Sequence, residues 1–126
     1  MDVICDTSFL MVIASSQIKC IDIMETLLGK LYFLVPSTVI SELKHLEKIA
    51  GDKRAKIARA AIELAISKFK VIEVVKSLYA DDAIVEYAVR HECAAATIDK
   101  NLRNRLIANK ILVLTLSRNK MIIANP

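Results

Sequence analysis

Short apolar runs alternate along the chain with longer segments in which apolar residues recur every three or four positions. Short runs bounded by polar residues are typical of buried strands, and the longer period is typical of amphipathic helices. The pattern predicts strands at residues 2–5, 31–35, 71–75, 94–98 and 111–115, with a last short strand at 121–124. It predicts helices at residues 8–16, 19–29, 37–50, 52–69, 80–92 and 100–109.

Strands separated by helices predict a parallel sheet, since parallel neighbours need a long crossover connection. We therefore expect an α/β fold, a three-layer α/β/α sandwich around a central parallel sheet of about five strands. A chain of 126 residues has the size of one domain, and we expect a single domain over residues 1–126. Ligands bind such sheets beyond the carboxyl ends of the strands, so polar residues at those ends are the first functional candidates.

Hydrophobic residues make up 55% of the chain, which is high for a soluble domain. No apolar run approaches the roughly 18 residues of a membrane-spanning helix, and strands buried on both faces account for the excess. The residues before the apolar run at 9–14 include Asp2 and Asp6 but no Lys or Arg, the wrong charge for a secretion signal. The three cysteines are widely spaced, as is common in reducing compartments. We expect a cytoplasmic protein without a membrane partner.

Two carboxylates come directly after predicted strands: Asp6 ends the first strand and Asp99 the fourth. Thr7 or Ser8 is then the expected cap of the helix that follows the first strand. Glu42 lies in the second turn of the helix after the second strand, bordering its apolar stripe. Taken singly, each acid is explained as well by a structural role, because acids near a helix N-terminus cap free amides and favour the helix dipole.

Asp81 and Asp82 open the helix predicted after the third strand. Helical phase separates them, because Asp81 falls beside the buried stripe of Ile84 and Ala88, whereas Asp82 points to the side of Glu86. Asp81 is therefore the better candidate for a direct metal ligand. Asp82 is either a helix cap or an acid that supports the metal ligands without binding the metal itself.

Asp6, Glu42, Asp81 and Asp99 are thus the acids expected at one edge of the sheet, with Asp82 beside them. Carboxylates this close raise one another's pKa values and cannot all stay ionised without a cation. Mg²⁺ and Mn²⁺ take carboxylate oxygen readily, so the pattern predicts a metal site. The chain has no GK[ST] or GxGxxG motif, which excludes a P-loop NTPase and argues against dinucleotide binding.

The chain has 18 basic and 14 acidic residues, and setting aside the five acids above leaves 9 acidic residues and a balance of +9. Such a surface suits a polyanionic partner, although an ordinary solvated surface gives the same balance. Two groups of cations are candidates for binding nucleic acid: Lys53, Lys56 and Arg59, and Lys100, Arg103 and Arg105 next to Asp99. The first group equally fits the solvated face of a helix. Most of the few aromatic residues fit the core, so recognition is expected to rest on backbone and shape.

Four segments carry a resemblance to a known family: Asp6-Thr7-Ser8; Pro36-Ser37 with Ser41-Glu42-Leu43; Asp81-Asp82-Ala83-Ile84; and Thr97-Ile98-Asp99-Lys100-Asn101-Leu102. In this order and spacing they resemble the PIN domain over nearly the full length of the chain. The resemblance implies the sheet order 3-2-1-4-5, which makes Asp6 and Asp99 neighbours. It also implies supporting roles for Ser8 and Thr97, and many relatives carry Asn where this chain has Ser8.

PIN domains are mostly metal-dependent endoribonucleases, so the resemblance implies RNA as substrate and Mg²⁺ or Mn²⁺ as cofactor. Asp6 and Asp99 are expected to hold the metal directly, and Glu42 and Asp81 to complete the cluster, partly through water. The segments after Asp81 and Asp99 look more like the branch that processes ribosomal RNA than like VapC-type toxins.

Rival functions remain open at this point. A VapC-type toxin would have an antitoxin as partner, and a ribosomal RNA nuclease would have a ribosome-assembly protein. A PIN fold can also bind RNA or protein without cutting, and the apolar helix at residues 8–16 could pack against a second copy of the chain. Cleavage without metal needs an acid–base pair that usually includes His, and neither His45 nor His91 lies at a predicted strand end.

Overall fold

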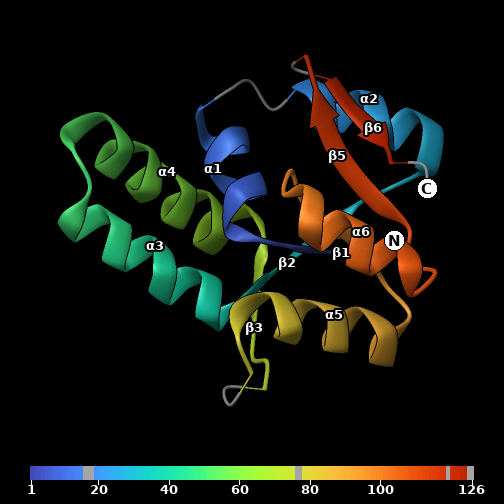
Figure 1. Ribbon diagram of the computed structural model, residues 1–126. Coiled ribbons are helices and arrows are strands. Elements are labelled where there is room, and N and C mark those ends of the chain that lie inside the picture. The colour runs from blue at the N-terminus through green and yellow to red at the C-terminus, as the bar shows by residue number, and fades with distance from the viewer. Residues whose placement is uncertain (16–18, 76–77, 119, 125–126) are drawn as a thin grey trace.

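The computed structural model describes residues 1–15, 19–75, 78–118 and 120–124. Strands and helices alternate within these ranges (Figure 1). Their bounds are β1 (Asp2–Cys5), α1 (Thr7–Ser15), α2 (Lys19–Leu28), β2 (Tyr32–Pro36), α3 (Ser37–Ile49), α4 (Asp52–Lys68), β3 (Lys70–Ile72), α5 (Ala80–His91), β4 (Ala94–Ala96), α6 (Lys100–Ala108), β5 (Val113–Ser117) and β6 (Lys120–Ile123).

One sheet joins these six strands in the order β3-β2-β1-β4-β5-β6. Neighbours from β3 to β5 run parallel, and β6 pairs antiparallel with β5. The connection after Ser117 is too short for a parallel crossover, so the chain turns back on itself there. The expected α/β class and the order 3-2-1-4-5 are confirmed, and the sheet is extended by a sixth strand.

Alternate residues of the central strands enter two apolar cores, because successive side chains of a strand point to opposite faces. Val3 and Cys5 of β1 pack in the core shared with α1 to α4. Ile4 packs in the second core, with α5 and α6. Figure 1 shows α3 and α4 together on one side of the sheet and α5 and α6 on the other, which gives the three layers. None of the helices in the described ranges is long and apolar enough to cross a membrane.

The boundaries of the five strands after β1 differ from expectation. β2 and β6 are shifted by one residue, and β4 covers Ala94–Ala96 rather than 94–98, so Asp99 lies three residues beyond its end. β3 covers only Lys70–Ile72 rather than 71–75, because its last partner is Pro36, which has no amide hydrogen to continue the ladder. β5 begins at Val113 rather than 111, because Lys110 takes a left-handed conformation with φ of 62° and Ile111 still donates to the carbonyl of Leu106 at the end of α6. The expected helix 8–16 runs from residue 7 to 15, and residue 16 lies outside the described residues.

β1 lies between β2 and β4, so the chain leaves it toward one side of the sheet and later returns on the other. Its pairing with β4 runs from Val3 opposite Ala94 to Cys5 opposite Ala96. The Asp6 amide then donates to the carbonyl of Ala96 at 3.2 Å, which brings the segments after the two strands side by side. This is the point of an open α/β sheet at which ligands bind.

Candidate active site

Asp6 is the first residue after β1 and caps α1. Its Oδ1 accepts a hydrogen bond of 2.9 Å from the Phe9 amide, as the side chain of an N-cap does. Asp6 is therefore the cap, instead of Thr7 or Ser8, and the helix begins one residue earlier than expected. Only 6% of Asp6 is exposed, so its carboxylate is largely removed from water.

Two hydroxyls hold the buried carboxylate of Asp6 from the other side. Thr97 Oγ1 donates to Asp6 Oδ2 at 2.5 Å, and Ser8 Oγ lies 2.9 Å from both carboxylate oxygens. Thr97 Oγ1 also accepts from the Asp99 amide at 3.0 Å. The fully buried Thr97 hydroxyl thus ties the end of β1 to the start of the segment that carries Asp99.

Asp99 caps the helix that follows β4, as Asp6 caps the helix that follows β1. It is the N-cap of α6, and its Oδ1 accepts a hydrogen bond of 2.9 Å from the Leu102 amide. Among the described residues, no donor bonds to its second carboxylate oxygen. The cap therefore leaves one oxygen of Asp99 available to a ligand.

Glu42 reaches the same place from α3, which lies in the same layer as α1. Its Oε2 accepts a hydrogen bond of 2.8 Å from Thr7 Oγ1. Thr7 is a residue that sequence reasoning considered only as a helix cap. Its contact with Glu42 spans 35 positions and leaves no local signal in the sequence.

The two acids that open α5 are separated in the way that helical phase predicts. Asp81 lines the same pocket as Asp6 and Asp99 and has no hydrogen-bond or ion-pair partner among the described residues. Asp82 turns toward α6, where its Oδ1 accepts a hydrogen bond of 2.7 Å from Arg105 Nη2. Asp82 is consequently not brought to the other four acids, and Arg105, a candidate for binding nucleic acid, is occupied by an ion pair.

The four remaining acids line one pocket of about 140 Å³. The carboxylates come from Asp6, Glu42, Asp81 and Asp99. The hydroxyls come from Thr7 and Ser8, and the apolar part of the wall is formed by Val39, Ala80 and Ile84. The acids come from four segments that are far apart in the sequence. We call this feature the acidic pocket.

Burial and mutual repulsion act on the carboxylates of the acidic pocket. Burial raises the pKa of Asp6, and the hydrogen bonds from Thr97, the Phe9 amide and Ser8 only partly oppose it. Burial and then the charge of Asp99 raise the pKa of Asp81, against the lowering effect of Arg105. Positive charge in the pocket would relieve both effects.

The donor set fits a hard divalent cation, because it consists of carboxylate and hydroxyl oxygens. In the described part of the chain, no three Asp, Glu, His or Cys side chains stand in a ready coordination arrangement. The hydrogen bonds explain this, since Asp6 is held by Ser8 and Thr97 and Glu42 by Thr7. Metal binding would replace or loosen such contacts while the backbone positions stay as they are.

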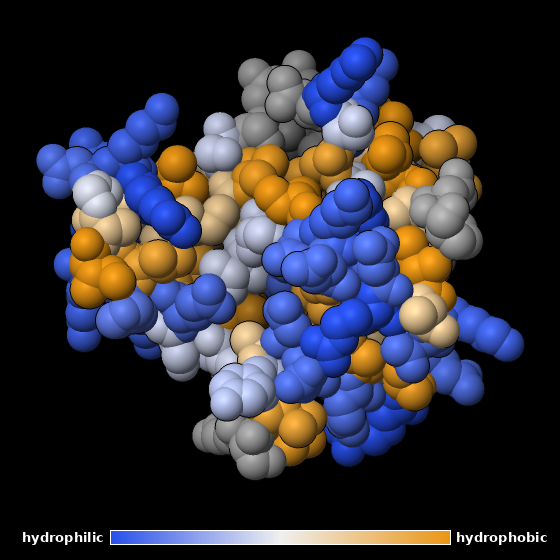
Figure 2. All heavy atoms as spheres, in the orientation of Figure 1, coloured by the Kyte–Doolittle hydropathy of each residue, from blue (hydrophilic) through white to orange (hydrophobic). Residues whose placement is uncertain are grey.

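The candidate cations for nucleic acid lie on two different surfaces. Lys100, Arg103 and Arg105 are on α6, whose N-cap is Asp99, and Figure 2 shows hydrophilic residues gathered over α6 and α5. Lys53, Lys56 and Arg59 are on α4, where the Arg59 Nε donates to Glu47 Oε1 at 2.9 Å. The α6 group therefore borders the acidic pocket, whereas the α4 group extends along a helix in the layer on the other face of the sheet.

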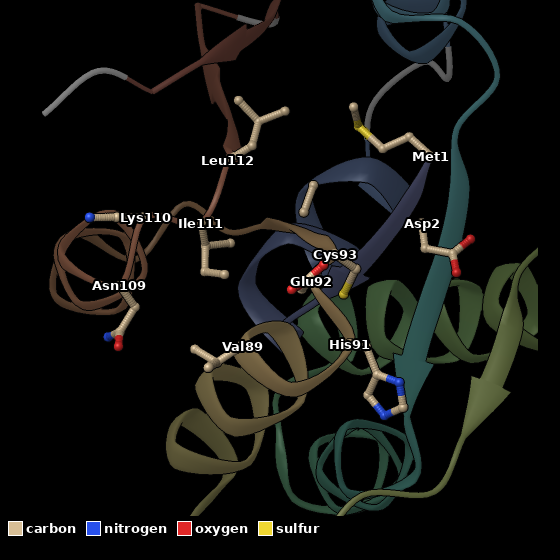
Figure 3. Close-up of a pocket in the computed structure, with 11 residues that line it drawn as sticks. Met1, Asp2, Val89, His91, Glu92, Cys93, Asn109, Lys110, Ile111 and Leu112 are labelled. Carbon is tan, nitrogen blue, oxygen red and sulfur yellow. The ribbon is translucent and has the colours of Figure 1, made fainter.

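A second pocket lies at the opposite, amino edge of the sheet (Figure 3). It has a volume of about 620 Å³, and its acids are Asp2 and Glu92. In Figure 3, Asp2 and His91 lie on one side and Asn109 and Lys110 on the other, with apolar side chains between them. Its polar groups are therefore dispersed instead of convergent.

Comparison with known proteins agrees with these features. A family model described as a PIN like domain matches residues 3–120. Ribonuclease VapC4 of Methanocaldococcus jannaschii is 33% identical over 119 residues, covering 91% of this chain and 89% of that protein. The structure of the PIN domain endonuclease Utp24 superposes with a TM-score of 0.77 at 27% identity, over 99% of this chain and 92% of the other.

A more distant structure, VapBC2 from Rickettsia felis bound to a DNA fragment from their promoter, shares the fold alone. It has a TM-score of 0.66 at 14% identity, over 93% of this chain and all of the other. The α/β fold with its mostly parallel sheet is therefore shared with these structures. The chain belongs to the PIN-domain family, and its relatives VapC4 and Utp24 are a ribonuclease and an endonuclease.

Proposed function

We propose that the protein is an endoribonuclease that hydrolyses RNA phosphodiester bonds at the acidic pocket with the help of Mg²⁺ or Mn²⁺. The observation that carries this proposal is the convergence of four carboxylates in one pocket beside the basic helix α6. Acids that only cap helices gain nothing from such convergence, because like charges repel. The ribonuclease VapC4, with 33% identity over most of both chains, supports the same chemistry.

Asp6 and Asp99 are the proposed direct ligands of the ion. They follow adjacent strands, and each keeps its backbone position through a helix cap. Glu42 and Asp81 complete the cluster from α3 and α5. When bound, a divalent ion lowers the pKa of a water molecule and stabilises the charge that develops on the attacked phosphate.

The remaining roles belong to residues that position these acids or the substrate. Thr97 and Ser8 hold the carboxylate of Asp6 in one orientation through their hydroxyls. Serine at position 8 keeps a hydrogen-bonding group where many relatives carry Asn. Lys100 and Arg103, in the first turn of α6, are placed to bind phosphates of the RNA backbone, which position a nucleic acid without reading its sequence.

Cleavage of a labelled RNA with and without divalent ions tests this proposal. Wild-type protein is expected to cleave in Mg²⁺ or Mn²⁺ and to stop when EDTA removes the ion. Asp99→Asn is expected to lose most activity, whereas Asp2→Asn, an exposed acid at the amino edge, keeps it. Cleavage that survives complete chelation, or that is undiminished in Asp99→Asn, contradicts the metal mechanism. RNA binding without any cleavage indicates a non-cleaving PIN module instead.

We further propose a role in the processing of ribosomal RNA, with a toxin as the second candidate. The structural similarity to Utp24 favours a processing nuclease with a ribosome-assembly partner, and the identity with VapC4 favours a toxin with an antitoxin partner. Expression in a bacterial host separates them. Growth arrest that a protein encoded next to the gene relieves supports the toxin, and normal growth with site-specific cleavage of precursor ribosomal RNA supports the processing enzyme.

A further inference from the structure

Tyr79 directly precedes two residues that line the acidic pocket, and its side chain lies in solvent. It is 85% exposed, the largest fraction among the large hydrophobic side chains that the structure describes. Its backbone is the N-cap of α5, and its carbonyl accepts a hydrogen bond of 2.9 Å from the Ala83 amide. The next two residues, Ala80 and Asp81, line the pocket. The ring therefore extends from backbone next to the pocket and belongs to neither core.

The other tyrosines have different surroundings. Tyr87 is half-buried and stacks on His91, with ring centroids 4.1 Å apart. Tyr32 is 56% exposed but begins β2, at the amino edge of the sheet. Tyr79 thus combines an open aromatic face with a backbone position next to the proposed cleavage site.

An exposed aromatic ring is a stacking surface for a nucleobase, because every base has a π face. The cations Lys100 and Arg103 lie on α6, beyond Asp99, whereas Tyr79 precedes Asp81 on α5. A strand whose phosphate enters the acidic pocket therefore meets cations from one helix and an aromatic ring from the other. Proteins that bind single-stranded nucleic acid combine these two elements.

We propose that Tyr79 stacks on the nucleobase next to the phosphate that is cleaved, and that this contact selects where on an RNA strand cleavage occurs. The inference rests on the proposed ribonuclease function. Stacking on a side chain requires an unstacked base, as loops and single strands provide and regular duplexes do not. The contact is expected to tolerate all four bases, since it uses the π face of the base instead of its edges.

Binding of a single-stranded oligoribonucleotide, measured in EDTA so that metal-dependent cleavage is absent, tests the stacking. Tyr79→Ala is expected to raise Kd about 5- to 150-fold, the range for loss of one base–aromatic stack. Tyr79→Phe keeps the ring and is expected to keep most of the affinity. Tyr32→Ala removes an exposed tyrosine at the amino edge and is expected to leave Kd unchanged.

Abasic substitutions around the mapped cleavage site provide a readout specific to the stacked base. One abasic position is expected to raise the KM of the wild-type protein by the same factor as Tyr79→Ala, with no further rise when both changes are combined. The chain has no Trp, so its intrinsic emission comes from three tyrosines. RNA is expected to quench this emission in the wild-type protein and to quench it less in Tyr79→Phe.

The outcomes separate this inference from the function on which it rests. Metal-dependent cleavage by the wild-type protein, together with an unchanged Kd and KM in Tyr79→Ala, overturns the stacking and leaves the ribonuclease standing. Equal losses in Tyr79→Phe and Tyr79→Ala assign the effect to the hydroxyl and also overturn the stacking. A wild-type protein that neither binds nor cleaves RNA overturns both.

Discussion

The two edges of the sheet carry pockets of opposite character. The pocket of Figure 3 at the amino edge has a volume of about 620 Å³ and contains two dispersed acids, whereas the acidic pocket at the carboxyl edge has only about 140 Å³ and contains four. The larger cavity is therefore not the one in which charge converges. What marks the candidate site is the number of like charges in a small space, because such an arrangement raises pKa values and calls for a counter-ion.

The direction of the chain explains the difference. Each of the strands β1 to β4 leads at its carboxyl end toward the N-terminus of a helix, where acids cap free amides, as Asp6 and Asp99 do. The amino edge receives helix C-termini instead. There α5 ends with Arg90, His91 and a left-handed Glu92, and α6 is followed by a left-handed Lys110. Helix polarity thus assigns acids to one edge, and the fold brings four of them together there.

The largest expected effect is the loss of activity when one acid of the acidic pocket is neutralised, compared with an acid at the amino edge. Asp6→Asn keeps an oxygen that can accept from the Phe9 amide, and burial already raises the pKa of Asp6, so the neutral side chain is expected to be tolerated. Metal-dependent cleavage is expected to fall at least about 100-fold, because the ion stabilises transition-state charge by several kcal/mol. Asp2→Asn is the control at the amino edge. Equal activity of both variants in a cleavage assay would contradict the contrast between the edges.

The next effect concerns the hydroxyl that connects β1 and β4. Thr97→Val removes a donor to Asp6 and an acceptor for the Asp99 amide, and is expected to lower the free energy of unfolding by about 1–3 kcal/mol. Thr115→Val is the matched control, a buried threonine on the adjacent β5 that does not line the acidic pocket. Urea unfolding measures both. A larger loss in Thr115→Val would show that the Thr97 network contributes little.

A smaller effect appears in the pH dependence of stability. The pKa of Asp81 is raised by burial and by Asp99, so its folded-state proton is bound more tightly than in the unfolded chain. Protonated Asp81 adds its full contribution to the free energy of unfolding below pH about 4, the ordinary pKa of Asp. This contribution is lost as pH rises through the raised pKa of the folded state. Without metal, Asp81→Asn is therefore expected to become more stable than the wild type as pH rises above about 4, with a gain in the free energy of unfolding of at most about 0.5 kcal/mol.

In the presence of Mn²⁺, the wild type is expected to be more stable than Asp81→Asn. The ion neutralises the repulsion in wild-type protein and raises its melting temperature, whereas Asp81→Asn gains less because it offers one ligand fewer. Thermal unfolding at neutral pH, with and without Mn²⁺, measures both shifts. An equal shift in the two proteins would place the ion away from Asp81.

Much of the fold follows from local pattern. The apolar run Val3 to Cys5 is buried on both faces, as the run alone predicts for a central parallel strand. The positions of Asp6 and Asp99 follow from the same rule, since a residue after a strand lies at the carboxyl edge. Helical phase also distinguishes Asp81, which lines the pocket, from Asp82, which does not.

Contacts between helices could not be predicted in this way. The pair of Arg105 with Asp82 and the bond of Thr7 to Glu42 depend on how neighbouring helices pack on the same face of the sheet, which no single segment encodes. The exposure of Tyr79 had no signal either, because an aromatic residue before a helix is as often buried against it. Long-range geometry decides these cases, whereas strand ends and helical phase are local.

The smallest expected effect compares the two ends of α6. Lys100 begins the helix beside the acidic pocket, and Lys110 follows it at the amino-edge pocket. If RNA phosphates contact only the carboxyl edge, Lys100→Gln weakens binding at every RNA sequence and lowers the slope of log K against log salt concentration by about 0.7, the value for one phosphate contact on a single strand. Lys110→Gln leaves the slope unchanged, although it removes the same charge from the protein. Titrations at several salt concentrations measure both slopes, and equal changes in the two variants would mean that the net charge of the protein, rather than a contact at one edge, attracts the RNA.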